Sequence, residues 1–244
     1  GNFSKSIIID NNLRLINNFN NQVEKLKNFT EKKEKFGLDL NSKNISWSSN
    51  LKSDLFRFNE INLDKNDLSS QIFVENYRPF TKNYFFNYKR LIDRSGASAY
   101  TYPTKKTKNL QIVLTGNGSS KDFSTLISDI ICDRHFQTNG QCFPLYYYEE
   151  LKTKQKGLFD DPNETDYVRH DAISDFILER AKKQYGKNVT KEDIFYYVYG
   201  FLHSKEYRET FANDLKKMLP KLPLVEDVKD FWAFSKAGRQ LAEL

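Results

Sequence analysis

The feature that most constrains the fold is a change in the spacing of apolar residues along the chain. Between residues 71 and 150, short runs of β-branched and aromatic side chains, such as QIVLTG and CFPLYYY, alternate with stretches rich in Gly, Asn, Ser and Pro. This pattern is typical of strands joined by turns. From residue 165 onward the apolar residues recur at helical spacing instead. Strands followed by a run of helices predict an α+β fold.

The same change of pattern divides the chain into three regions. Residues 1–70 are predicted to form an N-terminal helix and short strands that lead into the core, and residues 71–160 to form a β-rich core. Residues 161–244 are predicted to form a C-terminal helical bundle. The polar stretch GLFDDPNETD is the best linker candidate between the last two regions.

Shorter signals predict individual elements in the first two regions. SIIID is predicted as a short strand, and ISW around Trp47 as another. The apolar stripe from Leu15 to Phe29 predicts a helix between them. Inside the β-rich region, FSTLISDIICDRHF keeps helical spacing, so we expect a helix there as well.

Four helices are predicted in the C-terminal region. The first ends at Gly186, and the second opens with Thr190 and Asp193 at the spacing of a capping box. Ser204 is expected to cap the third, which stops at Pro220. The fourth covers DVKDFWAFSKAGRQLAEL. We interpret the apolar stripes of these helices as packing surfaces rather than ligand sites.

Composition excludes several classes of protein. The chain has 244 residues, 39% of them hydrophobic, which suffices for a sizeable core. Its longest apolar run, FYYVYGFL, is far shorter than the roughly twenty residues of a membrane span, and GNFSKSIIID has no secretion pattern. Two cysteines give no disulfide framework, so we expect a cytoplasmic protein. Because the only methionine is Met218, we also expect a piece of a longer polypeptide.

The positive charge is concentrated in one segment. The net charge of the chain is +6, and residues 77–108 hold eight basic side chains against the single acidic Asp93. The segment opens with the basic and aromatic stretch YRPFTKNYFFNYKR. A localised basic block is the electrostatic footprint of a protein that binds a phosphate backbone. A solvated basic face without a ligand gives the same pattern.

The stretch TGNGSSKD is the closest approach to a phosphate-binding loop. It lacks the Gly-Lys-Ser/Thr ending of a P-loop, so its lysine is not assigned to a nucleotide phosphate. Two interpretations remain. The stretch is either a plain turn or a loop that offers short polar side chains to DNA.

No motif indicates catalysis or a metal site. Cys132, His135 and Cys142 lack the paired ligand spacing of structural zinc, so we expect buried free thiols. The three histidines are scattered, and no Ser or Cys near them has the context of a catalytic nucleophile. We therefore predict no catalytic and no metal-binding residue in this chain.

Several stretches together resemble the C-terminal region of type ISP restriction–modification enzymes. They are YRPF with the following NYFFNYKR, the preceding ISWSSNLKSDLFRF, and then FSTLISDIICDRHF, GQCFPLYYYE and IFYYVYGFLHSKEYRETFANDLKKMLPKLPLV. The order and spacing of these stretches carry the resemblance, which covers roughly residues 44–244.

The resemblance implies a target recognition domain that selects a sequence in double-stranded DNA. A nuclease, a helicase-like ATPase and an adenine-specific DNA methyltransferase would occupy the rest of the parent polypeptide and would be partners of this domain. The parent would use S-adenosylmethionine, ATP and Mg, and would act on a flipped adenine. No cofactor, no enzymatic activity and no membrane partner are expected for this chain alone. A helical docking module and a cryptic nuclease or transferase fragment remain as alternatives.

The expected DNA contacts lie in the basic segment and in the polar loop. YRPF is interpreted as scaffold with phosphate contacts at its margins, because Pro79 indicates the start or the edge of a strand. The side chains predicted to contact DNA are Arg78, Lys82, Lys89, Arg90, Arg94, Lys105, Lys106, Lys108, Asn117, Ser119, Ser120 and Lys121.

Overall fold

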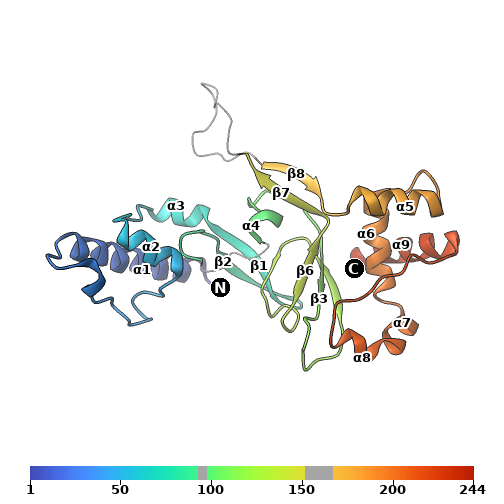
Figure 1. The fold of residues 1–244 in the computed structure, drawn as a ribbon, viewed down its shortest axis with the longest axis horizontal. Coiled ribbons are helices and arrows are strands. Elements are labelled where there is room, and N and C mark those ends of the chain that lie inside the picture. The colour runs from blue at the N-terminus through green and yellow to red at the C-terminus, as the bar shows by residue number, and fades with distance from the viewer. Residues whose placement is uncertain (93–97, 152–166) are drawn as a thin grey trace, which may run out of the picture. The chain divides into compact units, whose positions relative to one another are not determined.

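The computed structural model describes residues 1–92, 98–151 and 167–244. The described residues contain both helices and strands (Figure 1), which confirms the predicted α+β fold. The chain divides into two compact units. Unit 1 comprises Gly1–Glu75 and Thr81–Gly96, and unit 2 comprises Asn76–Phe80 and Ala97–Leu244. Within the described residues, no helix combines the length and the apolar character needed to cross a membrane. The predicted linker GLFDDPNETD lies outside the described residues.

Unit 1 is built around one long helix, α1 (Lys5–Lys27). The helix begins after Ser4, whose hydroxyl accepts a hydrogen bond from the Ile7 N–H. One face of α1 is buried and forms an apolar core with residues of the following helices. The other elements that start in unit 1 are η1 (Lys33–Lys35), α2 (Ser49–Phe56), α3 (Lys65–Ser70), β1 (Ile72–Arg78) and β2 (Thr81–Phe86).

The two strands predicted near the N-terminus are wrong. SIIID lies in the first turns of α1, because Ile9 and Leu13 extend the apolar stripe of the helix back to its start. The ISW stretch forms no strand, and the Trp47 indole N–H donates to the carbonyl oxygen of Asp39 (2.7 Å) instead. In both places burial against the core of unit 1 outweighs the β propensity of the isoleucines.

Unit 2 contains a three-stranded antiparallel sheet and a two-stranded ribbon. β3 is the middle strand of the sheet, between β4 and β6, and every residue of β3 is buried. β7 and β8 pair as the antiparallel ribbon. These elements are α4 (Ser98–Thr101), β3 (Gln111–Leu114), β4 (Thr125–Ser128), β5 (Ile131–Cys132), β6 (Gln141–Pro144), β7 (Tyr146–Glu150) and β8 (Tyr167–Asp171).

The helix predicted for FSTLISDIICDRHF is wrong, because β4 and β5 occupy this stretch. The buried middle strand β3 needs hydrogen-bond partners on both edges, and β4 supplies one of them, with Val113 opposite Leu126. The Ser128 hydroxyl then accepts the Ile130 N–H (3.2 Å) and donates to the Ile130 carbonyl oxygen (2.8 Å). These two bonds turn the chain between β4 and β5.

The C-terminal helices predicted from the apolar stripes are present. Thr190 and Asp193 form the predicted capping box, and Gly186 follows the first of these helices with a φ of 113°. The third predicted helix is interrupted at Phe211 and forms two short helices. The five helices of the described C-terminal residues are α5 (Asp175–Tyr185), α6 (Lys191–Phe201), α7 (Lys205–Thr210), α8 (Ala212–Leu215) and α9 (Val228–Ala242).

Helices α6 and α9 cross with their backbones in contact (Figure 1). A Cβ atom added at Gly200 would overlap the carbonyl oxygen of Phe234, and one added at Gly238 would overlap the carbonyl oxygen of Tyr196. Only glycine therefore permits this crossing. The close approach buries the ring of Phe231 completely in the centre of the bundle.

Replacing Gly200 by Ala should destabilise unit 2, because the added methyl group meets the backbone of α9. We expect the free energy of unfolding to fall by about 1–3 kcal/mol, as in other overpacked cores. Chemical denaturation followed by circular dichroism measures this change. Gln240→Ala, an exposed change on α9, is the matched control and should alter the free energy by less than about 0.5 kcal/mol. A Gly200→Ala variant as stable as the parent chain would contradict the close crossing.

His203 makes the stability of unit 2 sensitive to acid. Its Nε2 atom is buried without a hydrogen-bond partner among the described residues, and its ring lies edge-on to Tyr199. Burial, and to a lesser extent the charge of Arg208, lower the pKa of His203 from its ordinary value of 6.5. As the pH falls, the unfolded chain therefore binds this proton before the folded chain does. The contribution of the neutral ring to stability is complete above the unfolded pKa and is lost as the pH falls through the lowered folded pKa.

Replacing His203 by Phe should remove this part of the acid sensitivity. We expect the melting temperature to fall less in the variant than in the parent chain when the pH is lowered from about 7 to about 5, the range in which histidine titrates. Differential scanning calorimetry at several pH values measures the difference. Gln240→Ala, an exposed change at a residue that does not titrate, should keep the pH profile of the parent chain. Parallel profiles for His203→Phe and the parent chain would refute the role of His203.

Candidate nucleic-acid interface

Lys105 and Lys106 lie at the tip of a tight turn in unit 2, called here the basic turn (Thr104–Lys108). The Thr107 N–H donates to the Thr104 carbonyl oxygen (3.1 Å), and the Thr104 N–H donates to the Thr107 hydroxyl (3.1 Å). The two threonine hydroxyls lie 2.9 Å apart. Lys105, Lys106 and Lys108 are exposed. The turn therefore presents three ammonium groups on a loop that is closed by its own hydrogen bonds.

The buried side chain of Asn109 fixes the base of the basic turn. Its Nδ2 donates to the carbonyl oxygens of Thr101 (3.0 Å) and Tyr146 (2.8 Å). Its Oδ1 accepts the N–H of Tyr146 (3.1 Å) and the N–H of Leu110 (2.9 Å). One amide thus joins α4, the start of β3 and the start of β7. The basic turn is held in a defined place on unit 2 before any ligand binds.

The β7–β8 ribbon adds another cation beside the basic turn. The Tyr148 hydroxyl donates to the carbonyl oxygen of Lys108 (3.0 Å), and burial raises the pKa of Tyr148, which keeps this hydroxyl protonated. Tyr148 pairs in register with the exposed Arg169 of β8, whose guanidinium lies 4.4 Å from the centre of the Tyr146 ring. Sequence reasoning missed Arg169, because it stands alone in DYVRHD and only strand pairing brings it to this surface.

Two polar loops meet at one end of the β4-β3-β6 sheet. Leu114 at the end of β3 pairs with the first residues of both β4 and β6, so the first polar loop (115–124) and the second polar loop (133–140) share that end. The Gly116 N–H donates to the carbonyl oxygen of Thr138 (2.9 Å). A Cβ atom at Gly116 would overlap the backbone of Asn139, so glycine permits the contact between the loops.

The first polar loop is anchored to the segment that follows α8. The Gly118 N–H donates to the Lys216 carbonyl oxygen (3.1 Å), and the Lys216 Nζ lies 2.9 Å from the Asp122 carboxylate. The hydrogen bond and the charge of Lys216 lower the pKa of Asp122. The half-buried Ser119 hydroxyl accepts the Lys121 N–H (3.0 Å) within the loop. The predicted contact residues that remain exposed here are Asn117, Ser120 and Lys121.

The second polar loop adds exposed side chains that were not predicted: those of Arg134, His135 and Asn139. The Asp133 carboxylate accepts the His135 N–H (2.7 Å) and lies 3.5 Å from the Arg78 guanidinium. This places the predicted contact residue Arg78 beside the second polar loop. Sequence reasoning missed Arg134 because the stretch was assigned to a helix.

One family accounts for the whole chain. A family model of the Type ISP C-terminal specificity domain matches residues 1–244. The chain belongs to this family. The match confirms the resemblance seen in the sequence and extends it to the N-terminal residues. No curated protein sequence matches the chain.

Three solved structures contain a similar domain. The nuclease-deletion mutant of the Type ISP enzyme LlaGI, in complex with a DNA substrate mimic, is 33% identical with a TM-score of 0.71, over 99% of this chain and 20% of that chain. The ATP-dependent Type ISP enzyme LlaBIII, bound to DNA, is 28% identical with a TM-score of 0.76, over 99% of this chain and 14% of that one. The protein in the DrdV–DNA complex is 23% identical with a TM-score of 0.75, over 100% of this chain and 21% of that chain. At this identity the likeness shows only that the fold is shared. The specificity domain thus spans about a fifth or less of each solved chain.

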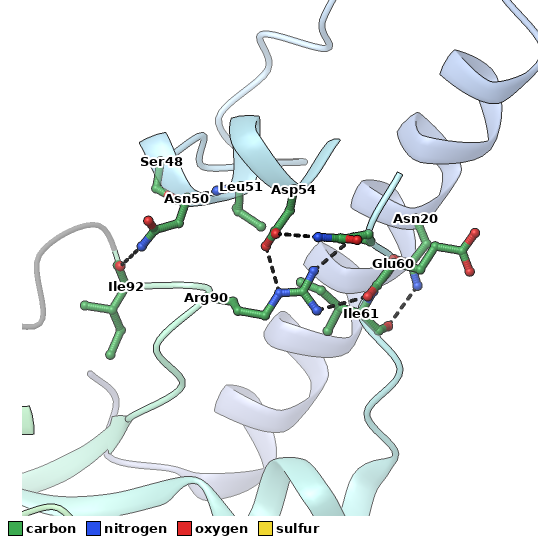
Figure 2. A network of polar contacts seen from close by, with 10 residues as sticks. Asn20, Ser48, Asn50, Leu51, Asp54, Glu60, Ile61, Arg90 and Ile92 are labelled. Carbon is green, nitrogen blue, oxygen red and sulfur yellow. Dashed lines mark hydrogen bonds and ion pairs between the residues drawn. The ribbon is translucent and has the colours of Figure 1, made fainter. Parts of the chain in front are cut away.

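Three predicted contact residues of the specificity domain belong to the described part of unit 1. Lys82 on β2 and Lys89 are exposed. Arg90 is bonded within the domain (Figure 2): its Nε donates to the Asp54 carboxylate (2.7 Å), and its Nη atoms donate to the carbonyl oxygens of Glu60 and Asn59 (both 2.9 Å). Arg90 therefore ties the loop after α2 to the end of that helix. The predicted contact residue Arg94 lies outside the described residues.

The two cysteines of the specificity domain are free and partly buried. A hydrogen bond with Cys142, together with burial, raises the pKa of Cys132, so this thiol stays protonated at neutral pH. In the part of the chain that the structure describes, no cluster of three or more His, Cys, Asp or Glu side chains could hold a metal ion.

Replacing Arg90 by Lys should destabilise unit 1, because an ammonium group cannot reproduce the three-sided contacts of the guanidinium. We expect the free energy of unfolding to fall by about 1–3 kcal/mol, since charge-assisted bonds are lost and carbonyl groups are left unpaired. Urea denaturation followed by Trp47 fluorescence in a Trp232→Phe background reports on unit 1. The neighbouring exposed change Lys89→Gln is the control and should have little effect. If Arg90→Lys is no less stable than this control, the structural role of Arg90 is refuted.

Proposed function

We propose that this domain binds double-stranded DNA and selects the target sequence of a longer restriction–modification enzyme. The observation that carries the proposal is the basic turn, which presents three exposed lysines on a rigid support, with Arg169 on the adjoining ribbon. Lysines neutralise phosphates and release counterions, which gives affinity for any duplex. The related LlaGI and LlaBIII structures, which contain DNA or a DNA mimic, support the proposal.

The two polar loops supply the groups that sequence selection needs. We propose that phosphate contacts come from Arg78, Lys82, Lys89 and the basic turn, and that Asn117, Ser119, Ser120 and Lys121 reach the bases or the adjacent backbone. Arg134 and Asn139 join them, because the second polar loop contacts the first. Asn amides and Arg guanidinium groups make paired hydrogen bonds to adenine and guanine edges. Arg90 is left out, because all three nitrogens of its guanidinium are bonded within unit 1 and its side chain is 29% exposed, against 42% for Arg78.

We further propose that catalysis takes place in other parts of the longer polypeptide. Those parts would include an adenine methyltransferase, a helicase-like ATPase and a nuclease, with S-adenosylmethionine, ATP and Mg as their cofactors. The family of the domain and its small share of the LlaGI and LlaBIII chains support this division. On this proposal the domain contacts the methyltransferase, works on DNA in the cytoplasm and has no activity of its own.

Replacing Lys105, Lys106 and Lys108 together by Gln should weaken binding to every duplex about equally. Each lost phosphate contact lowers the slope of log affinity against log salt by about 0.9, so the slope should fall by roughly two to three. Fluorescence anisotropy over a salt series measures it, on the target duplex and on a scrambled duplex. The target duplex is identified by mapping methylated sites in cells that express the longer enzyme.

Two further variants make this experiment specific. Lys183, Lys229 and Lys236 lie exposed on α5 and α9, and replacing all three by Gln removes the same charge far along the chain from the basic turn. This control should show the same slope of log affinity against log salt as the parent chain. Asn117→Ala should weaken binding to the target duplex but not to the scrambled one. An equal loss of slope in the control, or no loss in the basic-turn variant, would refute the proposed binding surface.

A further inference from the structure

The C-terminal helices of unit 2 form a groove that the proposed DNA contacts do not use. It has a volume of about 940 Å³ and lies between α7 and α8 on one side and the segment 216–227, together with α9, on the other. Its floor contains the buried side chains of Phe201, Tyr207 and Leu215. A volume of this size falls in the range of about 300–1,000 Å³ that is typical of ligand-binding pockets in proteins.

One wall of the groove is fixed by three tyrosine hydroxyls. Tyr207 donates to the carbonyl oxygen of Lys221 (2.9 Å), and Tyr197 donates to that of Pro223 (2.7 Å). Tyr185 donates to the carbonyl oxygen of Val225 (2.6 Å), so the three acceptors belong to every second residue of the segment. Alternate residues of an extended segment share one face, so the segment lies with one face bonded to the bundle. The wall is therefore formed before a partner binds.

The rim of the groove is apolar and partly exposed. Phe211, Met218, Leu219 and Leu222 are each between 38% and 43% exposed, and all four line the groove. Contiguous exposed apolar side chains that border a preformed groove mark a binding surface more often than isolated ones do. Burying these side chains against a partner would be favourable.

The charged side chains that line the groove indicate which kind of partner can bind there. The exposed carboxylates of Glu206, Asp214 and Asp230 line the groove, whereas Lys221 is the one basic residue among the described residues that do so. Within the described chain, none of the three carboxylates forms an ion pair with a side chain. A surface of this sign repels phosphate groups and attracts ammonium and guanidinium groups. Duplex DNA is thus a poor occupant of the groove.

We propose that this groove binds a basic amphipathic segment of a partner protein. Leucine-like side chains of the segment would fill the space between Phe211 and Leu219, and Lys or Arg side chains flanking them would meet the three carboxylates. This is the helix-in-groove mode of recognition, in which spaced apolar anchors give affinity and rim charges give orientation. The inference is independent of DNA binding, because the groove and the basic turn carry opposite charge.

A labelled helical peptide of leucine and lysine tests the groove, with the same peptide carrying Glu for every Lys as the charge control. Anisotropy should show that the 244-residue chain binds the lysine peptide and not the glutamate peptide. Met218→Gln with Leu219→Gln should weaken binding by about tenfold or more, because two apolar anchors are lost. Glu206→Gln with Asp214→Asn and Asp230→Asn, which replaces each exposed carboxylate by its neutral isostere, should weaken binding at low salt and remove most of its salt dependence.

Matched changes outside the groove complete the test. Phe176 is 68% exposed on α5, and Phe176→Gln should bind the lysine peptide like the parent chain. Equal affinity for the two peptides, or parent-like affinity in both groove variants, would overturn the proposal. Sedimentation that shows a dimer broken by Met218→Gln with Leu219→Gln would also overturn it, because the occupant would then be a second copy of the chain.

Discussion

The buried amide of Asn109 is the interaction on which the candidate interface depends. It exchanges hydrogen bonds with both the N–H and the carbonyl oxygen of Tyr146, and its second donor holds the end of α4. Only an amide side chain offers two donors and an acceptor in this geometry. The carboxylate of an aspartate has no donor, and a leucine side chain has neither donor nor acceptor. A buried polar group with its partners in place adds rigidity to its surroundings. On the proposed function, the lysines of the basic turn project from a support that needs no ordering when DNA binds, which reduces the entropic cost of association.

Unit 2 uses opposite charge to separate two kinds of surface. The basic turn and Arg169 are joined to the β-rich part through Asn109 and Tyr148, whereas carboxylates line the groove of the C-terminal helices. Both surfaces are preformed by hydrogen bonds from buried or half-buried side chains to backbone carbonyl oxygens. A phosphate backbone and a basic protein segment could thus be bound by one compact unit without competing, because each surface repels the ligand of the other.

The elements that the sequence predicted best are the helices, which depend on the local spacing of apolar residues and on helix-capping residues. The stripes of α5, α6 and α9 and the capping box at Thr190 are local, so they are found where expected. The strand β4 was missed because its conformation is set by pairing with β3, a contact that helical spacing of apolar residues conceals. The basic block predicts phosphate contacts for Lys105, Lys106, Lys108 and Arg90 alike, but charge counting alone does not show that the partners of Arg90 lie far away in the sequence (Figure 2). Arg134 was missed because its stretch was assigned to a helix, and Arg169 required the register of β7 with β8.

Amide hydrogen exchange with and without a duplex that contains the target site tests the central claim most directly. If the basic turn and the two polar loops form the DNA-binding surface, exchange should slow in residues 104–108, 115–121 and 133–139 when the duplex is added. The amides of α9, which are buried in helical hydrogen bonds on the bundle, should exchange at the same rate with and without DNA. Protection confined to α7, α8 and α9, with none in the basic turn, would contradict the account.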